Sequence, residues 1–240
     1  MESRKNLHKQ NKKPILALIL AIIAIIIAVV AFNFSKIQSN WDWMTMKQEQ
    51  KLNVPEINQM PDLPNGCEVT SLAMLLQYYK INVTKSELAQ KIAHVDSYTS
   101  NGKMRGNPHQ GFVGSMSVQN AGWCVYNEPL YNVALKYTNR IRNYTGHSFI
   151  DVLKLVSDGH PVLIITTLKF SRVHDMQTWT TPQGKVKVTP SSHACVITGY
   201  NKKTKQVYVN DPYGTKNKAV SWKNIEASYN QQGKQALYVA

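Results

Sequence analysis

Acidic residues are scarce in this chain of 240 residues, which has 14 Asp and Glu against 28 Lys and Arg. Five of the basic residues and one acidic residue precede Pro14, so the remainder still carries a net charge of +10. The lysines are scattered singly and no nucleic-acid-binding motif is present, so we expect no nucleic-acid partner. A basic surface of this kind does predict adhesion to anionic cell-wall polymers.

Cysteines are also few, and no two of them form a close C-x-x-C pair, which argues against a structural zinc site. We expect neither a metal nor an organic cofactor. The three cysteines, Cys67, Cys124 and Cys195, leave at least one thiol unpaired. In a compartment that permits disulfides, an odd cysteine indicates either an intermolecular link or a reactive thiol.

Only one long hydrophobic run occurs, ILALILAIIAIIIAVVAF from Ile15 to Phe32. Eighteen residues without a charge can cross a bilayer as a helix, and the basic arm before them favours a cytoplasmic N-terminus. We therefore predict a basic arm over 1–14, a transmembrane signal anchor over 15–34 and a stalk over 35–51. Cleavage as a signal peptide is the alternative. Either way, we expect residues 52–240 outside the cell, anchored to the membrane or secreted.

The rest of the chain shows no internal repeat and no second linker. Apolar residues at helical spacing predict helices first, and β-branched runs predict strands afterwards. Between the first and the second expected strand, residues 169–187 form a polar loop that we expect to be mobile. The expected helices cover 67–80, 84–94, 127–137 and 148–157. The expected strands cover 161–167, 193–200, 206–210 and 236–240, the last of them at an edge of the sheet. This order is typical of an α+β fold, with a helical half packed on an antiparallel sheet.

Cys67 follows a glycine turn and begins an amphipathic helix. At that position the positive end of the helix dipole and the unpaired N–H groups would lower the pKa of the thiol. Taken alone, the pattern also fits a small apolar cysteine buried at a helix start. The choice between the two depends on whether a base and its partner are found nearby.

His193 and Asp211 are the candidates for the base and its partner. Reflection about the turn near Lys202 places the two nearly opposite each other on an antiparallel hairpin. A carboxylate in that position would orient the imidazole and fix its tautomer. The alternative is a surface cross-strand pair, which the apolar character of the strand disfavours. Of the other six histidines, His174 is the next candidate.

Gln59 lies eight residues before Cys67. A side-chain amide held beside the nucleophile can donate to an oxyanion together with the backbone N–H of the nucleophile. By itself, a glutamine at this distance carries no such meaning.

Four segments in this order resemble bacterial cysteine peptidases of the bacteriocin-processing, double-glycine leader family. They read VPEINQMPDLPNGCEVTSLAMLLQYY, GNPHQGFVG, SSHACVITGYN and VYVNDPYG. The resemblance covers about 52–213 and is to the stand-alone, cell-surface branch. It implies a papain-like fold in which Cys67 is the nucleophile, His193 the base, Asp211 its orienting partner and Gln59 a member of the oxyanion hole.

One departure from the family affects Gln59. Members fused to transporters keep the glutamine closer to the cysteine, whereas Pro61 to Asn65 lengthen the gap here. The GNPHQGFVG loop is part of the resemblance, and its glycines suggest the wall of a cleft formed by backbone.

The sequence thus predicts a cysteine peptidase that hydrolyses peptide or isopeptide bonds of a peptide or protein substrate through an acyl-enzyme. An amidase or transpeptidase acting on cell-wall peptides would use the same residues, because an amine can capture the same intermediate. A surface binding module that keeps the fold without turnover is the alternative outside enzymes.

Overall fold

The structure, a computed structural model, describes residues 12–240, and the contacts divide the chain between Thr45 and Met46. The described part of the first unit is one helix, α2 (Lys12–Thr45). Among the residues that the structure describes, no helix long and apolar enough to cross a membrane is found, and the transmembrane helix over 15–34 stays a prediction. The predicted basic arm lies outside the described residues as far as residue 11.

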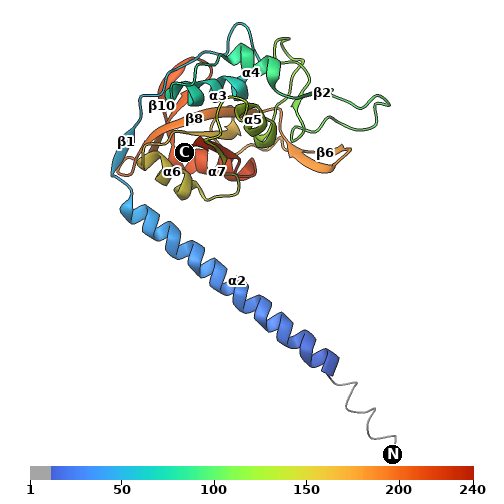
Figure 1. The fold of residues 1–240 in the computed structure, drawn as a ribbon, viewed down its shortest axis with the longest axis vertical. Coiled ribbons are helices and arrows are strands. Elements are labelled where there is room, and N and C mark those ends of the chain that lie inside the picture. The colour runs from blue at the N-terminus through green and yellow to red at the C-terminus, as the bar shows by residue number, and fades with distance from the viewer. Residues whose placement is uncertain (1–11) are drawn as a thin grey trace, which may run out of the picture. The chain divides into compact units, whose positions relative to one another are not determined.

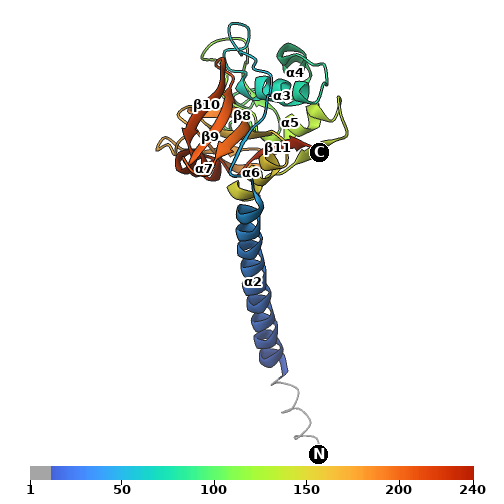
Figure 2. The ribbon, with the colours of Figure 1, turned by 90° about the vertical axis from the view of Figure 1, so that its left-hand side faces the viewer.

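The second unit, from Met46 to Ala240, is built around an antiparallel sheet of seven strands. Six strands follow the order β10-β9-β8-β5-β11-β4, and β1 pairs with β8 beside them. Their bounds are β1 (Glu49–Lys51), β4 (Ile141–Asn143), β5 (Val162–Thr167), β8 (Ser192–Asn201), β9 (Gln206–Asp211), β10 (Thr215–Ser221) and β11 (Ala236–Val239). Figure 2 shows β8, β9 and β10 side by side. The predicted mixed fold with an antiparallel sheet is confirmed.

Helices cover both faces of this sheet. Figure 1 shows α3 and α4 on one side of β8 and α6 and α7 on the other. The helices are α3 (Cys67–Tyr78), α4 (Lys85–Lys91), α5 (Asn127–Ala134), α6 (Phe149–Ser157) and α7 (Trp222–Gln231). The side chain of Thr84 caps α4 by accepting from the Glu87 backbone N–H, as the capping-box pattern predicts. The four predicted helices are all present, although the first three end earlier than expected.

The central strands β5 and β8 are buried on both faces because helices lie on each side of them. Every residue of β5 is buried, as are all residues of β8 except its two ends. This explains why their sequences read as continuous apolar runs rather than alternating ones. β8 returns through a turn into β9, which is the hairpin predicted from 193–200 and 206–210.

Three local predictions differ from the structure. The polar segment 169–187 forms most of a hairpin of β6 (Gln177–Thr181) and β7 (Gly184–Val188). In β6 the buried Trp179 and Thr181 alternate with exposed residues, which is a strand pattern. His94 belongs to β2 (His94–Val95), which pairs in parallel with β3 (Phe112–Val113), and does not end a helix. The last strand, β11, lies between β5 and β4 rather than at an edge.

Candidate functional site

The start of α3 is fixed by the turn that precedes Cys67. The side-chain amide of Asn65 donates to the carbonyl oxygens of Ser115 and Val118, at 2.9 and 2.8 Å. A Cβ on Gly66 would lie only 2.6 Å from the Cβ of Leu63, so only glycine fits this close approach. The turn therefore places Cys67 at the first position of the helix, where the sequence predicts it.

His193 at the start of β8 and Asp211 at the end of β9 lie side by side. Nε2 of His193 is 3.0 Å from Oδ1 of Asp211, and both side chains are almost fully buried. Because a carboxylate only accepts, Nε2 carries the proton and donates it, which leaves Nδ1 as the acceptor nitrogen. Nδ1 is buried and has no hydrogen-bond partner in the described part of the chain. The predicted pairing of these two residues is thus present, and the second ring nitrogen is free to take a proton.

Asp211 is held by three donors. Besides His193, it accepts from Nζ of Lys218 at 2.8 Å and from the backbone N–H of Tyr213 at 3.2 Å. Burial alone would raise the pKa of Asp211, but the hydrogen bonds from His193 and Lys218 outweigh it and hold the pKa well below its usual range. Asp211 is therefore ionised at any physiological pH.

Two aromatic side chains enclose the imidazole of His193. Tyr213 stacks on one face, with ring centroids 5.4 Å apart and an interplanar angle of 19°. Phe170 meets the ring edge-on, at 5.8 Å. Tyr213 itself is 50% exposed, so it separates His193 from solvent on that side. The pair of His193 and Asp211 consequently works in a dry environment, where its hydrogen bond is stronger than in water.

Cys67 faces β8, the strand of His193, because the backbone N–H of Ala194 in that strand is close enough to donate to its sulfur. Its pKa is nevertheless raised well above the usual value, first by burial and next by the charge and the hydrogen bond of Glu68, while Ala194 acts in the opposite direction. The expected lowering by the helix start is therefore wrong for this arrangement. Burial and a neighbouring carboxylate exceed the effect of the helix dipole.

Glu68 is a component that the sequence reasoning missed. Its carboxylate is 1% exposed and accepts from Sγ of Cys67 at 3.2 Å and from the backbone N–H of Val125 at 3.1 Å. Burial raises its pKa to about 7, although the hydrogen bonds from Val125 and Cys67 lower it in part. The acidic residue directly after the cysteine is visible in the sequence, but on a helix it could equally have faced solvent.

Gln59 lies beside the turn that leads to Cys67, and its place in an oxyanion hole stays a prediction. Its side chain is buried, and Nε2 donates to the carbonyl oxygen of Pro64 at 2.7 Å. A side-chain amide has two N–H donors, so one remains for another acceptor. The backbone N–H of Gln59 donates to the carbonyl oxygen of Pro212 at 2.7 Å, which connects Gln59 to the residue that follows Asp211.

The other cysteines are free and buried, and no disulfide is formed between the three. Burial raises the pKa values of both Cys124 and Cys195, as it does that of Cys67, so the pKa does not distinguish the three thiols. His174, the alternative base, lies in the segment between β5 and β6. Across residues 12–240 no group of three or more His, Cys, Asp or Glu side chains is arranged to hold a metal ion.

Chemically, the arrangement combines a thiol, an imidazole with one free nitrogen, a carboxylate that fixes the other nitrogen, and a spare amide donor. This is the set of groups that acyl transfer through a thioester needs. The sequence identified four of its members. It missed Glu68, Lys218 and Tyr213, of which Lys218 reaches Asp211 only through the pairing of β10 with β9.

Comparison with known proteins gives one family. The model of the Peptidase_C39 like family matches residues 51–237. The protein YvpB of Bacillus subtilis (strain 168), itself uncharacterized, is 43% identical over 191 residues, which cover 78% of this chain and 75% of YvpB.

Among solved structures, a candidate C39-like peptidase from Bacillus anthracis is similar to this chain with a TM-score of 0.77 and 39% identity. The match covers 81% of this chain and 98% of that protein. A double-glycine-motif protease from an AMS/PCAT transporter, solved with a leader peptide, matches at a TM-score of 0.41 and 17% identity, covering 79% of this chain and 92% of that one. That last match is too distant to support an argument about chemistry.

Proposed function

The chain belongs to the Peptidase_C39 like family, and we propose that its second unit is a cysteine peptidase acting through Cys67, His193 and Asp211. The substrate is a peptide or protein, and the bond is a peptide or isopeptide bond. One observation carries the proposal: Nε2 of His193 is fixed on Asp211, which leaves Nδ1 buried and without a partner. The imidazole is held in this way directly beside Ala194, the residue of β8 whose backbone N–H is near the sulfur of Cys67. An imidazole in that position can take the thiol proton.

In the first step, the proton of Cys67 Sγ moves to Nδ1 of His193, and the thiolate attacks the carbonyl carbon of the scissile bond. The oxyanion that forms accepts from the backbone N–H of Cys67 and from the second N–H of Gln59. His193 then gives its proton to the leaving amine, and a thioester remains. Water attacks the thioester with His193 as the base, which restores the thiol and releases the acid product.

Asp211 stabilises the imidazolium that is formed during both steps. Because Lys218 and the Tyr213 N–H hold Asp211 ionised and in place, the orientation of the imidazole does not change when it takes a proton. Tyr213 lies over His193 and keeps bulk water away from the proton that is being transferred.

An extracytoplasmic location is part of the proposal and rests on the charge bias around residues 15–34. We also propose that the second unit binds anionic cell-wall polymers, because it carries an excess of positive charge. Protease added to intact cells should then digest the second unit. Digestion only after lysis would contradict this location.

The activity is tested with the full-length chain and dye-labelled casein as a general substrate. Cys67→Ala should abolish release of the dye, because no other side chain forms the thioester, whereas the matched variant Cys195→Ala should retain it. Thermal melting of each variant checks that it is folded. Equal activity of folded Cys67→Ala and wild type would overturn the proposal.

A further inference from the structure

Arg105, in the loop between β2 and β3, is stacked on three aromatic rings. Its guanidinium carbon lies 4.1 Å from the ring centroid of Tyr98, 4.7 Å from that of Trp179 and 5.2 Å from that of Trp123. Trp123 and Trp179 pack edge-on at 4.7 Å. The backbone N–H of Arg105 donates to the carbonyl of Thr180 in β6, so the β6–β7 hairpin fixes this residue. We call these three rings the aromatic cage.

The edges of the guanidinium remain available. Within residues 12–240, no hydrogen bond or ion pair of the Arg105 guanidinium is found in addition to its ring contacts. The ring contacts are not hydrogen bonds, so they leave the five N–H donors of the guanidinium without an acceptor. A guanidinium whose conformation is fixed by stacking, with unused donors, is suited to bind a carboxylate through two parallel hydrogen bonds.

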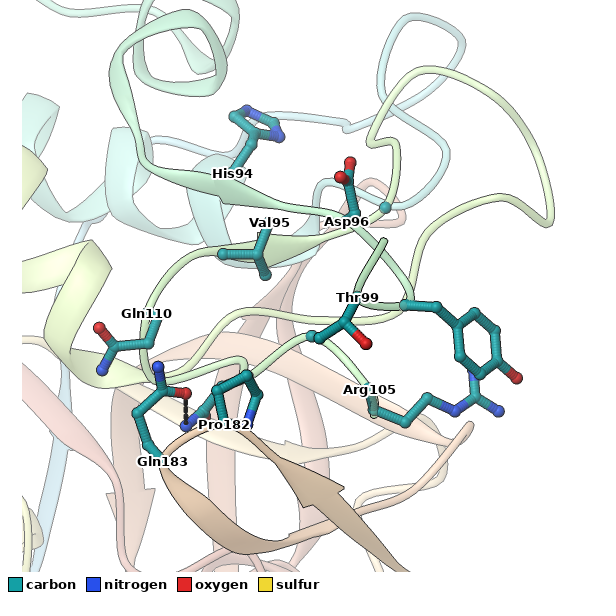
Figure 3. A pocket seen from close by; sticks show the side chains of 12 residues that line it. His94, Val95, Asp96, Thr99, Arg105, Gln110, Pro182 and Gln183 are labelled. Atoms are coloured by element: carbon teal, nitrogen blue, oxygen red, sulfur yellow. Dashed lines mark hydrogen bonds between the residues drawn. The ribbon is translucent and has the colours of Figure 1, made fainter. Parts of the chain in front are cut away.

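Arg105 also lines a pocket of about 390 Å³ between the loop and the hairpin. Gly106 allows the backbone to close up there, because a Cβ at that position would lie 2.1 Å from the carbonyl oxygen of Asp96. Gln183 forms part of the wall and accepts from the side-chain amide of Asn107 at 3.1 Å. In Figure 3, the Asp96 carboxylate and the Arg105 side chain point away from each other. The lining of the pocket thus includes one basic residue, Arg105, and one acidic residue, Asp96.

A short extended segment connects the aromatic cage to the nucleophile. Trp123 donates its backbone N–H to the carbonyl of Val113, and two residues later Val125 donates to Glu68, the neighbour of Cys67. Two residues of extended chain span about 7 Å. A substrate lying extended across Cys67 would reach the pocket with a residue about two to four positions from the scissile bond.

We propose that this pocket is a substrate subsite in which Arg105 binds the carboxylate of an Asp or Glu side chain in the peptide. Asp96, which also lines the pocket, would accept from N–H donors of the same peptide. The inference rests on the proposed peptidase function and names its substrate class, a peptide with an acidic residue near the cleaved bond. The positive charge of the second unit favours the approach of such a peptide.

Arg105→Met keeps much of the aliphatic stem in the aromatic cage and removes the charge. Lys103→Met is the matched control, because Lys103 is an exposed cation of the same loop and does not line the pocket. Wild-type chain should cleave a mixed peptide library with a preference for Asp or Glu at one position within four residues of the cut, read by mass spectrometry. Arg105→Met should lose that preference by about tenfold or more, and Lys103→Met should keep it. Retention of the preference in Arg105→Met, or cleavage of the library by the wild type without this preference, would overturn the subsite.

A second arm separates the subsite from the activity. The Cys67→Ala chain is titrated by calorimetry with the capped peptides Gly-Gly-Glu-Gly-Gly and Gly-Gly-Gln-Gly-Gly. Binding should be at least about tenfold tighter for the Glu peptide, and Arg105→Met or Arg105→Lys in the same background should remove most of this difference. Equal binding of the two peptides would overturn the subsite even if the library is cleaved. Selective binding without any cleavage by the wild type would support the subsite and refute the peptidase activity instead. Arg105→Lys serves as the folded alternative should Arg105→Met not melt like the wild type.

Discussion

Replacement of Glu68 by Gln tests the structural account of the nucleophile most directly. Glu68 accepts from Sγ of Cys67 and from the Val125 N–H within a fully buried site. Glutamine has the same shape and keeps an oxygen for Val125, but it carries no charge and offers an N–H to the sulfur. The substitution therefore removes a negative charge about 3 Å from the thiol and little else.

The size of the effect follows from the two pKa values. A charge in contact with a titrating group shifts its pKa by about 1–3 units, and each unit changes the thiolate fraction about tenfold. Because the pKa of Glu68 is raised to about 7, its charge is present at pH 8 and mostly absent at pH 5.5. Cys124, Tyr126 and Tyr213, which also feel the charge of Glu68, have pKa values raised first by burial and stay neutral over this range.

The rate of alkylation of Cys67 by iodoacetamide, with the labelled residue identified by mass spectrometry, is the measurement. Glu68→Gln should react at about the wild-type rate at pH 5.5 and about tenfold or more faster at pH 8. Glu49→Gln, on the exposed strand β1, is the matched control and should follow the wild type throughout. A ratio of rates that is the same at both pH values, or slower labelling of Glu68→Gln at pH 8, would refute the reasoning.

The same substitution has a consequence for stability. Since folding raises the pKa of Glu68 from 4.5 to about 7, the native state favours its protonated form. The resulting stability is fully present below pH 4.5 and is lost as the pH rises through about 7. The loss amounts to about 3 kcal/mol of unfolding free energy at pH 8. Glu68→Gln should therefore be more stable than the wild type in urea at pH 8, and the difference should disappear near pH 4.5.

The remaining predictions concern the other residues of the site, measured as kcat/KM on one substrate with melting as the check on folding. His193→Ala should lose nearly as much activity as Cys67→Ala, whereas His160→Ala should not; if folded His193→Ala retained the wild-type rate, His174 would be tested as the base. Asp211→Asn should be milder, because an amide oxygen still accepts from Nε2, and a loss as large as that of His193→Ala would contradict this. Gln59→Ala should reduce turnover by about 10²–10³ and leave it measurable, provided that the Cys67 N–H still contributes; an unchanged rate would remove Gln59 from the oxyanion hole.

The sequence was sufficient for those parts of the site that depend on local pattern. Cys67 was placed because a glycine turn and an amphipathic helix leave few alternatives for the first helical position. A short turn sets the register of a hairpin and so predicts that His193 and Asp211 lie close together. The observed ladder ends at the pair of Val196 and Asn210, after a register shift between Ile197 and Gly199, so the two residues meet just beyond it rather than as a directly opposite pair. In each case the relevant contact is made within one helix start or one hairpin.

The parts that were missed depend on contacts between distant segments. Lys218 meets Asp211 only because β10 adds to β9 beyond another turn, and a register shift occurs between them. Glu68 faces inward because the loop before α5 delivers the Val125 N–H. The polar composition of 169–187 predicts a mobile loop, yet β6 and β7 pair there as a hairpin on which Arg105 packs. Polar composition alone does not distinguish a mobile loop from an exposed hairpin.

The pKa of Cys67 shows how magnitudes decide between two correct local arguments. A helix start stabilises an anion by about 0.3–1 kcal/mol, which is less than one pKa unit. Burial and a carboxylate in contact act in the other direction and can each exceed this several times. The thiolate is therefore not formed in advance, and the proton has to leave Cys67 for Nδ1 of His193 as substrate is attacked. This is why His193→Ala should be nearly as damaging as loss of the sulfur, although the histidine forms no bond to the substrate.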